Sequence, residues 1–348
     1  MLTDDTLREG LQTPGFAFSI NERIEIARQL SKAGLRRALV SYPSAHWSEA
    51  EVARTIVKEN LFDETYALGR TVREDIDAIY ETGANISMHL PFEVADLGKI
   101  EESVKYASTK GGLVEVAIVN VAAYTPDQII KMAKRIEMAG ANVIQLPDTT
   151  GTATPNHMRA VIQAAKRSLN AKIEVHCHND SGASVLNAFT AYEAGADYID
   201  CTVFGIGERN GISDLGTVES ILSLSGYETG INRAELRKLY ELMAEILVRK
   251  LGPDFLFRNF PVYGENSGIH TAGTHAAFSG TFHGEKFSVN VYTGRSMIRR
   301  LLAANNIELN ERDLKMLVEK VKDISVKEGR AMGVAEIVKL ARENSGGA

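Results

Sequence analysis

The chain has 348 residues, of which 44% are hydrophobic and 24% are charged, which is an ordinary composition for a globular protein. This length is too great for one small domain. Its formal net charge of −6 provides no surplus of basic side chains to neutralise phosphates, which argues against a nucleic-acid partner. Two cysteines give no disulfide framework, and no apolar run resembles a leader segment or is long enough to cross a bilayer. We therefore expect a cytoplasmic protein that acts on small molecules, with no membrane partner.

One sequence pattern recurs along the first 225 residues: a helix-like segment is followed by glycine and then by a short apolar run. Gly34, Gly83, Gly140 and Gly195 stand at these points, and glycine readily takes the left-handed conformation that ends a helix. The predicted strands are residues 2–6, 35–41, 65–69, 85–89, 113–119, 142–147, 172–178 and 197–204. The predicted helices between and after them are residues 20–33, 48–59, 74–81, 100–108, 126–139, 155–168, 183–194 and 215–223.

Strands that alternate with helices indicate parallel βαβ units. Eight such units in about 225 residues predict an α/β fold of the (β/α)8 TIM-barrel type. A doubly wound open sheet is the alternative, but the chain lacks a glycine-rich phosphate fingerprint after its first strand.

The pattern changes after residue 226. Residues 232–251 predict one long helix with Asn232 as its N-cap, and the following stretch is rich in glycine, histidine and threonine. The C-terminal part predicts two amphipathic helices at 311–326 and 334–343. The expected organisation is a catalytic barrel at 1–230, a linker helix with a lid-like segment at 231–285, and a smaller helical C-terminal subdomain at 286–348.

Dense polar clusters follow four of the predicted strands, at residues 4–12, 145–151, 176–180 and 205–211. In a TIM barrel the active site lies at the C-terminal ends of the strands, so all four clusters fall at the same rim. A chain without a site there would scatter such clusters over both ends.

His176 and His178 are two residues apart on a predicted strand, so they face one side while Cys177 faces the other. Two imidazoles on one face are consistent with half of a divalent-metal site, the alternative being two hydrogen-bonded interior histidines. A carboxylate from the first strand would complete a site with open positions for a bidentate 2-oxo acid. Arg8 beside it would stabilise a developing alkoxide, and Thr149 would donate to the substrate carboxylate.

The chain resembles the DRE-TIM metallolyases, the group of isopropylmalate synthase, homocitrate synthase, citramalate synthase and the hydroxymethylglutaryl-CoA lyases. The resemblance covers nearly the whole chain. The matching pieces are residues 5–10 with Gln12, 148–151, 176–180, 205–211 and 267–270.

The resemblance implies that Glu9, His176 and His178 hold one divalent ion, which the sequence does not distinguish among Mn, Mg, Zn, Co and Fe. It implies that Arg8 assists at the substrate keto group and that Thr149 binds the 2-oxo acid carboxylate. Synthases of the family join acetyl-CoA to a 2-oxo acid in a Claisen-type step and then hydrolyse the thioester. The resemblance also implies a homodimer, because family members pass the segment after the barrel to a partner subunit.

Several residues indicate which branch of the family the chain resembles most and which substrate it accepts. Glu9 and Ile212 resemble homocitrate synthases, whereas Ala117 stands where those enzymes place an arginine for the distal carboxylate of 2-oxoglutarate. Leu39 likewise replaces a glutamate, and an unpaired carboxylate in such a pocket would be costly. Oxaloacetate, phosphonopyruvate, pyruvate and branched 2-oxo acids therefore stay open as substrates, with His89 and Ala117 shaping the pocket.

For the general base we favour His270, because the ordinary pKa of histidine suits proton transfer near neutrality, with Glu265 as the competitor. Glu208 is expected either to touch the substrate or the base or to be a structural partner of Arg209, and Gln12 is expected to belong to the site, the alternative being that it orders the loop. A hydroxyacyl-CoA lyase and a non-catalytic barrel are the alternatives. Ile212 and the segment 205–210 argue against the lyase. The retention of Arg8, Glu9, His176 and His178 together argues against the inactive barrel.

Overall fold

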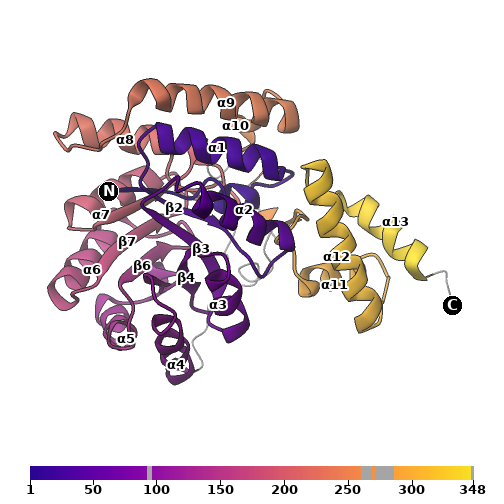
Figure 1. Cartoon of the computed structure of the whole chain (residues 1–348), viewed down its shortest axis with the longest axis horizontal. Coiled ribbons are helices and arrows are strands. Elements are labelled where there is room, and N and C mark those ends of the chain that lie inside the picture. The colour runs from indigo at the N-terminus through magenta and orange to yellow at the C-terminus, as the bar shows by residue number, and fades with distance from the viewer. Residues whose placement is uncertain (92–95, 260–265, 267–268, 271–285, 346–348) are drawn as a thin grey trace.

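The computed structural model describes residues 1–91, 96–259, 266, 269–270 and 286–345. Within them, eight strands pair in sequence order and close into a barrel (Figure 1). Every neighbouring pair is parallel, including the closing pair of the first and eighth strands. The strands are β1 (Leu2–Asp4), β2 (Arg37–Ser41), β3 (Glu64–Arg70), β4 (Asn85–His89), β5 (Val114–Ala117), β6 (Val143–Asp148), β7 (Lys172–Cys177) and β8 (Tyr198–Cys201). The predicted TIM barrel is confirmed.

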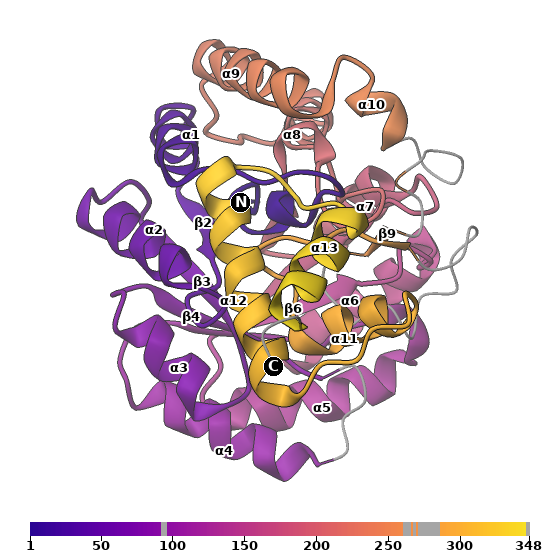
Figure 2. The ribbon, with the colours of Figure 1, turned by 90° about the vertical axis from the view of Figure 1, so that its right-hand side faces the viewer.

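Helices surround the sheet and bury apolar side chains against it (Figures 1 and 2). Ser19 and Thr125 start two of these helices with reciprocal capping boxes, which satisfy backbone N–H groups at the helix ends. Gly34 follows the first helix with φ +99°, and a Cβ there would lie 2.6 Å from the Gly230 carbonyl oxygen, so the position requires glycine. The barrel helices are α1 (Ile20–Lys32), α2 (Trp47–Lys58), α3 (Arg73–Tyr80), α4 (Leu97–Ser108), α5 (Pro126–Met138), α6 (Pro155–Ser168), α7 (Ser184–Glu193) and α8 (Leu215–Leu224).

Several strands are shorter than the sequence predicts, and β5 and β8 are examples. β5 ends at Ala117 rather than at residue 119, and β8 ends at Cys201 rather than at residue 204. After each strand a non-glycine residue takes a left-handed conformation, Asn120 with φ +58° and Phe204 with φ +61°. Asn120 precedes the short 3-10 helix η2 (Val121–Ala123), and Phe204 lies within the 3-10 helix η3 (Val203–Gly205) at the rim.

The inside of the barrel is polar toward the N-terminal ends of the strands. Arg37 is almost fully buried at the start of β2 and lies between the rings of Tyr66 and Tyr198, 4.0 and 4.4 Å from the ring centroids. Its guanidinium pairs with Glu115 and Glu174, which point inward from β5 and β7. TIM-barrel interiors are more often filled by branched apolar side chains, so this layer is a distinctive feature of the chain.

Beyond the barrel, α9 (Arg233–Leu251) packs along α1, with the Gln29 amide donating to the Glu235 carbonyl oxygen, and α10 (Phe255–Arg258) follows. Strands β9 (Ile269–His270) and β10 (Lys286–Phe287) form a short parallel pair. The C-terminal part contains three helices and not the predicted two: α11 (Arg295–Ala303), α12 (Glu311–Glu328) and α13 (Val334–Ser345). The division of the chain at residues 230 and 285 stays a prediction.

The C-terminal helices have their own apolar core and lie at one end of the barrel (Figure 2). The segment before α11 fastens them to the loop after β1. The buried Asn290 side-chain amide donates to the carbonyl oxygens of Leu11 and Phe16, and the Gly15 N–H donates to Ser288 Oγ over 2.9 Å. Val291 joins the core of the barrel, so this contact combines hydrogen bonding with apolar burial.

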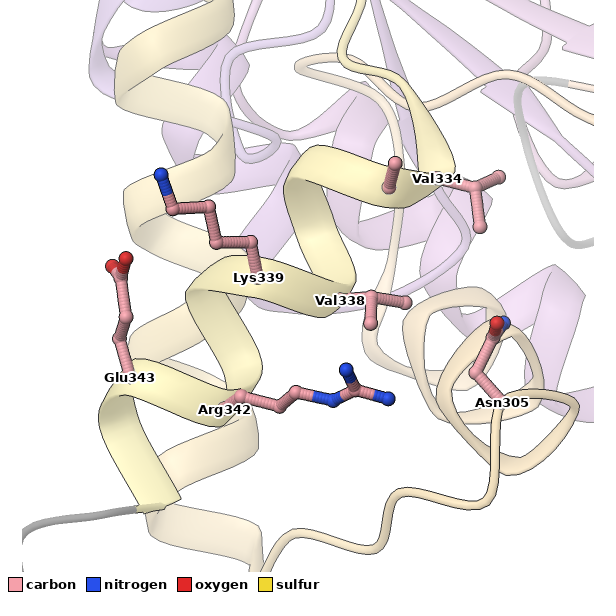
Figure 3. A pocket seen from close by; sticks show the side chains of 7 residues that line it. Asn305, Val334, Val338, Lys339, Arg342 and Glu343 are labelled. Atoms are coloured by element: carbon pink, nitrogen blue, oxygen red, sulfur yellow. The ribbon is translucent and has the colours of Figure 1, made fainter.

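A surface groove lies between α13 and the end of α11 (Figure 3). Val334 and Val338 form its apolar side, while Arg342 and Asn305 stand at its edge. None of the polar clusters that the sequence singles out lines this groove. Among the helices described, none is both long and apolar enough to cross a membrane.

The buried carboxyl group of Asp4 is expected to make the free energy of unfolding depend on pH. Its buried carboxyl group accepts hydrogen bonds from the Thr6 N–H (3.0 Å) and hydroxyl (2.8 Å), but burial outweighs them and raises its pKa from 3.8 to about 7. The folded state therefore holds the proton more tightly than the unfolded chain. This stabilisation is complete below about pH 4 and is lost as the pH rises to about 7.

In Asp4→Asn the side chain cannot ionise. We expect the free energy of unfolding of the variant, relative to the wild type, to increase by a few kcal/mol between pH 5 and pH 8. Urea denaturation at both pH values measures this difference. A difference that does not change with pH would contradict the assignment.

Candidate active site

The loop after β1 brings the first cluster of site residues to the rim. The Asp5 carbonyl oxygen accepts hydrogen bonds from the backbone N–H groups of Arg8 (3.2 Å) and Glu9 (2.7 Å), which folds the chain into the 3-10 helix η1 (Glu9–Gln12). Arg8, Glu9 and Gln12 are all buried in this turn. Their side chains therefore enter the mouth of the barrel and not the solvent.

The structure brings Glu9, His176 and His178 together. One possible ligand atom from each lies within 4.8 Å of the others, and all three residues are buried. The two imidazole centroids are 5.0 Å apart, although β7 itself ends at Cys177 and His178 forms an isolated bridge with Ile212. Two imidazoles and a carboxylate with open positions form a suitable donor set for a divalent transition metal, so the residues fit the predicted ion.

The two predicted histidine ligands and the cysteine between them lie in different surroundings. Cys177 belongs to the apolar core between sheet and helices, and burial raises the pKa of its thiol well above the ordinary value. The alternation of side chains along β7 accounts for this separation.

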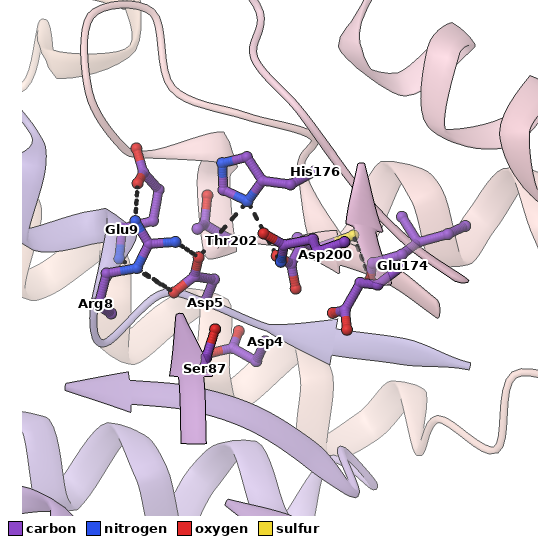
Figure 4. A network of polar contacts seen from close by, with 12 residues as sticks. Asp4, Asp5, Arg8, Glu9, Ser87, Glu174, His176, Asp200 and Thr202 are labelled. Carbon is purple, nitrogen blue, oxygen red and sulfur yellow. Dashed lines mark hydrogen bonds and ion pairs between the residues drawn. The ribbon is translucent and has the colours of Figure 1, made fainter. Parts of the chain in front are cut away.

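Hydrogen bonds orient the groups of this cluster (Figure 4). Glu9 Oε1 accepts from the Glu208 N–H and Oε2 accepts from Arg8 Nη1, both over 2.7 Å. His176 Nδ1 lies 3.0 Å from Asp200 Oδ2, so Nε2 lies on the opposite edge of the ring. Carboxylates commonly orient metal-binding imidazoles in this way.

A second group of possible ligands, Asp5, His176 and Asp200, shares one histidine with the first. The Asp5 carboxylate pairs with the Arg8 guanidinium, and Asp200 Oδ2 accepts from Gln145 Nε2 over 2.8 Å. These carboxylates are therefore engaged by protein donors, and we interpret them as supports of His176.

Gly207 makes room for the Glu9 carboxyl group. A Cβ at position 207 would lie 2.7 Å from Glu9 Oε1, which is closer than real Cβ atoms approach. The glycine in the loop after β8 thus lets the backbone reach the acidic side chain from the loop after β1. This contact joins the two ends of the barrel sequence at the site.

Arg8 is held by three neighbours. Its Nε donates to Asp5 Oδ1 over 3.1 Å, and its Nη1 donates to Glu9 Oε2 and, over 3.1 Å, to Gln12 Oε1. Burial opposes the charge of Arg8, but Asp5 and Glu9 outweigh burial and keep its pKa above the ordinary value. The guanidinium is therefore a fixed positive charge beside the candidate metal ligands.

Thr149 is held in place by an ion pair that the sequence prediction missed. Arg209 Nε and Nη2 donate to the Asp180 carboxylate over 2.8 and 2.9 Å, and Nη2 also donates to the Thr149 carbonyl oxygen over 2.7 Å. Glu208 lies farther from Arg209, with Nη1 and Oε2 3.5 Å apart. The sequence does contain a signal for this pair: Asp180 and Arg209 carry opposite charges and belong to the clusters 176–180 and 205–211, which both follow strands at this rim.

Asp148 organises the loop after β6. Its carboxylate accepts from the backbone N–H groups of Thr152 and Ala153, each over 3.1 Å, and burial raises its pKa to about 6. The Asn120 N–H donates to Thr149 Oγ1 over 2.8 Å, which leaves the hydroxyl proton of Thr149 to point elsewhere.

The predicted pocket wall lies on neighbouring strands. His89 at the end of β4 is paired in register with Ala117 at the end of β5, and Ala117 with Gln145 on β6. Ala117 is on the same face of β5 as the inward-pointing Glu115, and both Ala117 and Leu39 are buried. Ala117 and Leu39 therefore contribute small and apolar surface to this part of the barrel mouth, next to His89.

Two predicted residues cannot be placed in the site. Glu265 lies outside the described residues, and His270 is described only as part of the backbone of β9. Their assignment as general bases stays a prediction.

Three non-glycine residues in the loops of this rim have left-handed backbone angles: Asn120, Phe204 and Arg209. Phe204 is the least expected, because bulky residues rarely adopt this conformation. Its ring packs against Tyr240 and Phe255, with centroids 4.7 and 5.5 Å away, and this packing holds the strained turn. Such strain is concentrated at functional sites in many proteins.

Comparison with known proteins identifies the family. The HMGL-like family model matches residues 1–243. The chain belongs to the HMGL-like family. The resemblance to the DRE-TIM metallolyases is confirmed.

Curated relatives of this HMGL-like chain include a probable 2-isopropylmalate synthase from Methanopyrus kandleri, 31% identical over 93% of this chain and 69% of the relative. Homocitrate synthase AksA from Methanocaldococcus jannaschii is 33% identical over 78% of this chain and 70% of the relative. These names confirm the predicted class of enzyme, an acyltransferase.

Among solved structures, the HMG-CoA lyase of Bacillus subtilis has a TM-score of 0.62 and is 19% identical, covering 70% of this chain and 92% of the lyase. The carboxyl transferase domain of Rhizobium etli pyruvate carboxylase, solved with 3-hydroxypyruvate, has a TM-score of 0.63 and 18% identity, covering 75% of this chain and 51% of that one. At these identities the likeness concerns the fold alone.

Proposed function

We propose that this HMGL-like enzyme condenses acetyl-CoA with a 2-oxo acid and hydrolyses the resulting thioester, releasing CoA and a 2-substituted malate. The supporting observation is the convergence of Glu9, His176 and His178 beside the fixed charge of Arg8. The names of the curated relatives agree with this reaction class.

Glu9, His176 and His178 are the proposed ligands of a divalent ion. When bound, such an ion supplies Lewis-acid polarisation of a keto group and holds a bidentate 2-oxo acid. Arg8, fixed by Asp5 and Gln12, faces the same place and stabilises negative charge on the keto oxygen as the carbon–carbon bond forms. The Thr149 hydroxyl, held by the Asn120 N–H, donates to the substrate carboxylate.

Condensation needs a base that removes a proton from the methyl group of acetyl-CoA. His270 and Glu265 are our candidates from the sequence, and Glu208 is a third candidate, buried beside Arg209 and Glu9. The methyl carbon then attacks the keto carbon, the keto oxygen gains a proton, and water cleaves the thioester to a carboxylate and CoA.

We further propose that the 2-oxo acid has a small or branched apolar side chain. Arginines buried in the barrel and at its rim each pair with a carboxylate of the protein: Arg8 with Asp5, Arg37 with Glu174, and Arg209 with Asp180. Against the buried Leu39 and Ala117, a second substrate carboxylate would lose hydration, and neither of these two apolar side chains can pair with it. This consideration favours pyruvate and branched acids over oxaloacetate, phosphonopyruvate and 2-oxoglutarate.

Release of free CoA, detected with a thiol reagent, tests the proposal. Acetyl-CoA alone, and acetyl-CoA with each of those five kinds of 2-oxo acid, are the reactions to compare. We expect release with pyruvate or a branched acid and at least about tenfold lower kcat/KM with the acids that carry a second anionic group. Absence of release with every acid would refute the synthase, and cleavage of a hydroxyacyl-CoA to acetyl-CoA would support the lyase alternative.

The family resemblance also leads us to propose a homodimer. Sedimentation equilibrium distinguishes a mass near twice 38.0 kDa from that of a single chain. A protein that stays at the single-chain mass while releasing CoA would contradict the dimer without affecting the proposed reaction.

A further inference from the structure

A column of buried charged side chains runs inside the barrel from its N-terminal end toward the candidate site. It begins at Arg37 on β2, whose side chain is only 1% exposed. Arg37 Nη2 and Nε donate to Glu174 Oε2 over 2.5 and 3.2 Å. The rings of Tyr66 and Tyr198 cover the two faces of the guanidinium, which restricts its orientation.

The next members connect this arginine to His176. Glu174 precedes His176 by two residues on β7, so both side chains point into the barrel. Glu174 is in register with Tyr198 on the neighbouring strand β8, so the side chain of Asp200, two residues further along β8, lies on the same inner face of the barrel. Asp200 Oδ2 in turn lies 3.0 Å from His176 Nδ1 and accepts from Gln145 Nε2 (Figure 4). Arg37, Glu174, Asp200 and His176 thus lie in series on the inner face of the barrel, with ion-pair or hydrogen-bond contacts at both ends of the series.

We propose that Arg37 is a positioning residue for His176, acting through Glu174 and Asp200 from the far end of the barrel. The inference rests on the proposed function, in which His176 is a metal ligand. A carboxylate on Nδ1 fixes the tautomer and the orientation of an imidazole, and the carboxylate must itself be held. Arg37 supplies the positive charge that fixes the Glu174 carboxylate in place.

The chemistry of burial supports this role over a purely structural one. An ion pair in a protein interior is often no more stabilising than apolar side chains of the same volume. Apolar side chains would close this end of the barrel equally well. The polar series is therefore better explained by the orientation of His176, where one carboxylate oxygen must stay in place.

Another buried arginine of the same chain provides a matched control. Arg23 pairs bidentately with Glu49 and donates to the Val40 carbonyl oxygen. Neither Arg23 nor Glu49 hydrogen bonds to Glu9, His176 or His178 in any contact described for them. Arg23→Met and Arg37→Met therefore both break a buried ion pair, but only Arg37→Met disturbs the column.

The experiment titrates Co²⁺ into the metal-stripped protein and follows the visible absorption of the bound ion, which also gives its dissociation constant. We expect Arg37→Met to weaken Co²⁺ binding by up to about 10-fold and to change the absorption spectrum, because direct outer-sphere partners of ligands have effects of about 10- to 100-fold and Arg37 acts through two intervening residues. Arg37→Lys restores the charge and should recover part of the affinity. Arg23→Met should bind Co²⁺ as the wild type does.

If Arg37→Met does not fold, Glu174→Gln and its control Glu49→Gln provide the same comparison with an isosteric change. Wild-type affinity and spectrum in Arg37→Met or Glu174→Gln would overturn the inference, as would an equal loss in the control variant. Wild-type protein that binds no Co²⁺ would overturn the metal site and this inference together. Wild-type protein that binds Co²⁺ but releases no CoA would remove the proposed reaction and leave the positioning role to be judged by the variants.

Discussion

Replacing His178 by alanine is expected to reduce the bound divalent ion from about one per chain to almost none and to lower CoA release at least about a thousandfold. The buried His178 ring lies beside His176 and within ligand distance of Glu9, so its loss leaves two protein donors for an ion that needs three. Elemental analysis after gel filtration measures the metal, and the thiol assay measures turnover.

Cys177→Ala is the control for this change. Cys177 lies on the same strand but faces the apolar core, so the variant should keep its metal and its activity while losing about 1–2 kcal/mol of stability. Undiminished metal content in His178→Ala would remove this residue from the ligand set. Loss of metal in Cys177→Ala would show that strand disturbance alone is sufficient.

Arg8→Lys is expected to lower kcat by about 10²- to 10³-fold while the ion stays bound. Lysine keeps the charge but has no planar fork, so it cannot bond Asp5 through two atoms and still reach Glu9 and Gln12. Because the lost contact is made chiefly to developing negative charge, kcat should fall more than KM rises for the 2-oxo acid. Steady-state kinetics with saturating acetyl-CoA measure both constants.

Arg23→Lys provides the comparison. It alters an equally buried bidentate arginine–glutamate pair, so it should lower stability in urea without a comparable loss of kcat. Equal losses of kcat in the two variants would indicate general destabilisation. An unchanged kcat in Arg8→Lys would exclude the proposed role of the guanidinium fork.

The local signals of the sequence account for most of the fold. Gly34 and Gly83 follow helices and take the left-handed angles that the pattern predicts, because a C-terminal helix turn depends only on adjacent residues. The ends of β5 and β8 were predicted too late, since their apolar runs continue while the backbone turns at Asn120 and Phe204. α11 was missed, although its buried residues Met297, Ile298, Leu301 and Leu302 have helical spacing.

Some features of the candidate site were predicted from the sequence, and others appear only in the structure. The facing pair His176 and His178 follows from strand alternation, and motif resemblance adds Glu9 from the other end of the barrel sequence. The Asp180–Arg209 pair and the contacts of Asn290 with the loop after β1 were not predicted. Their members are far apart in the chain, so no periodicity links them.

By itself, the sequence determined the alternation of helices and strands, the rim on which the polar clusters lie, and the identity of the candidate ligands. Only the tertiary structure decided which charges are paired: Arg8 with Asp5, Arg209 with Asp180, and Arg37 with Glu174. The physical reason is that secondary structure depends on near neighbours, whereas closure of the barrel brings side chains from distant strands into one buried interior. There each charge needs a partner, and the geometry of closure selects it.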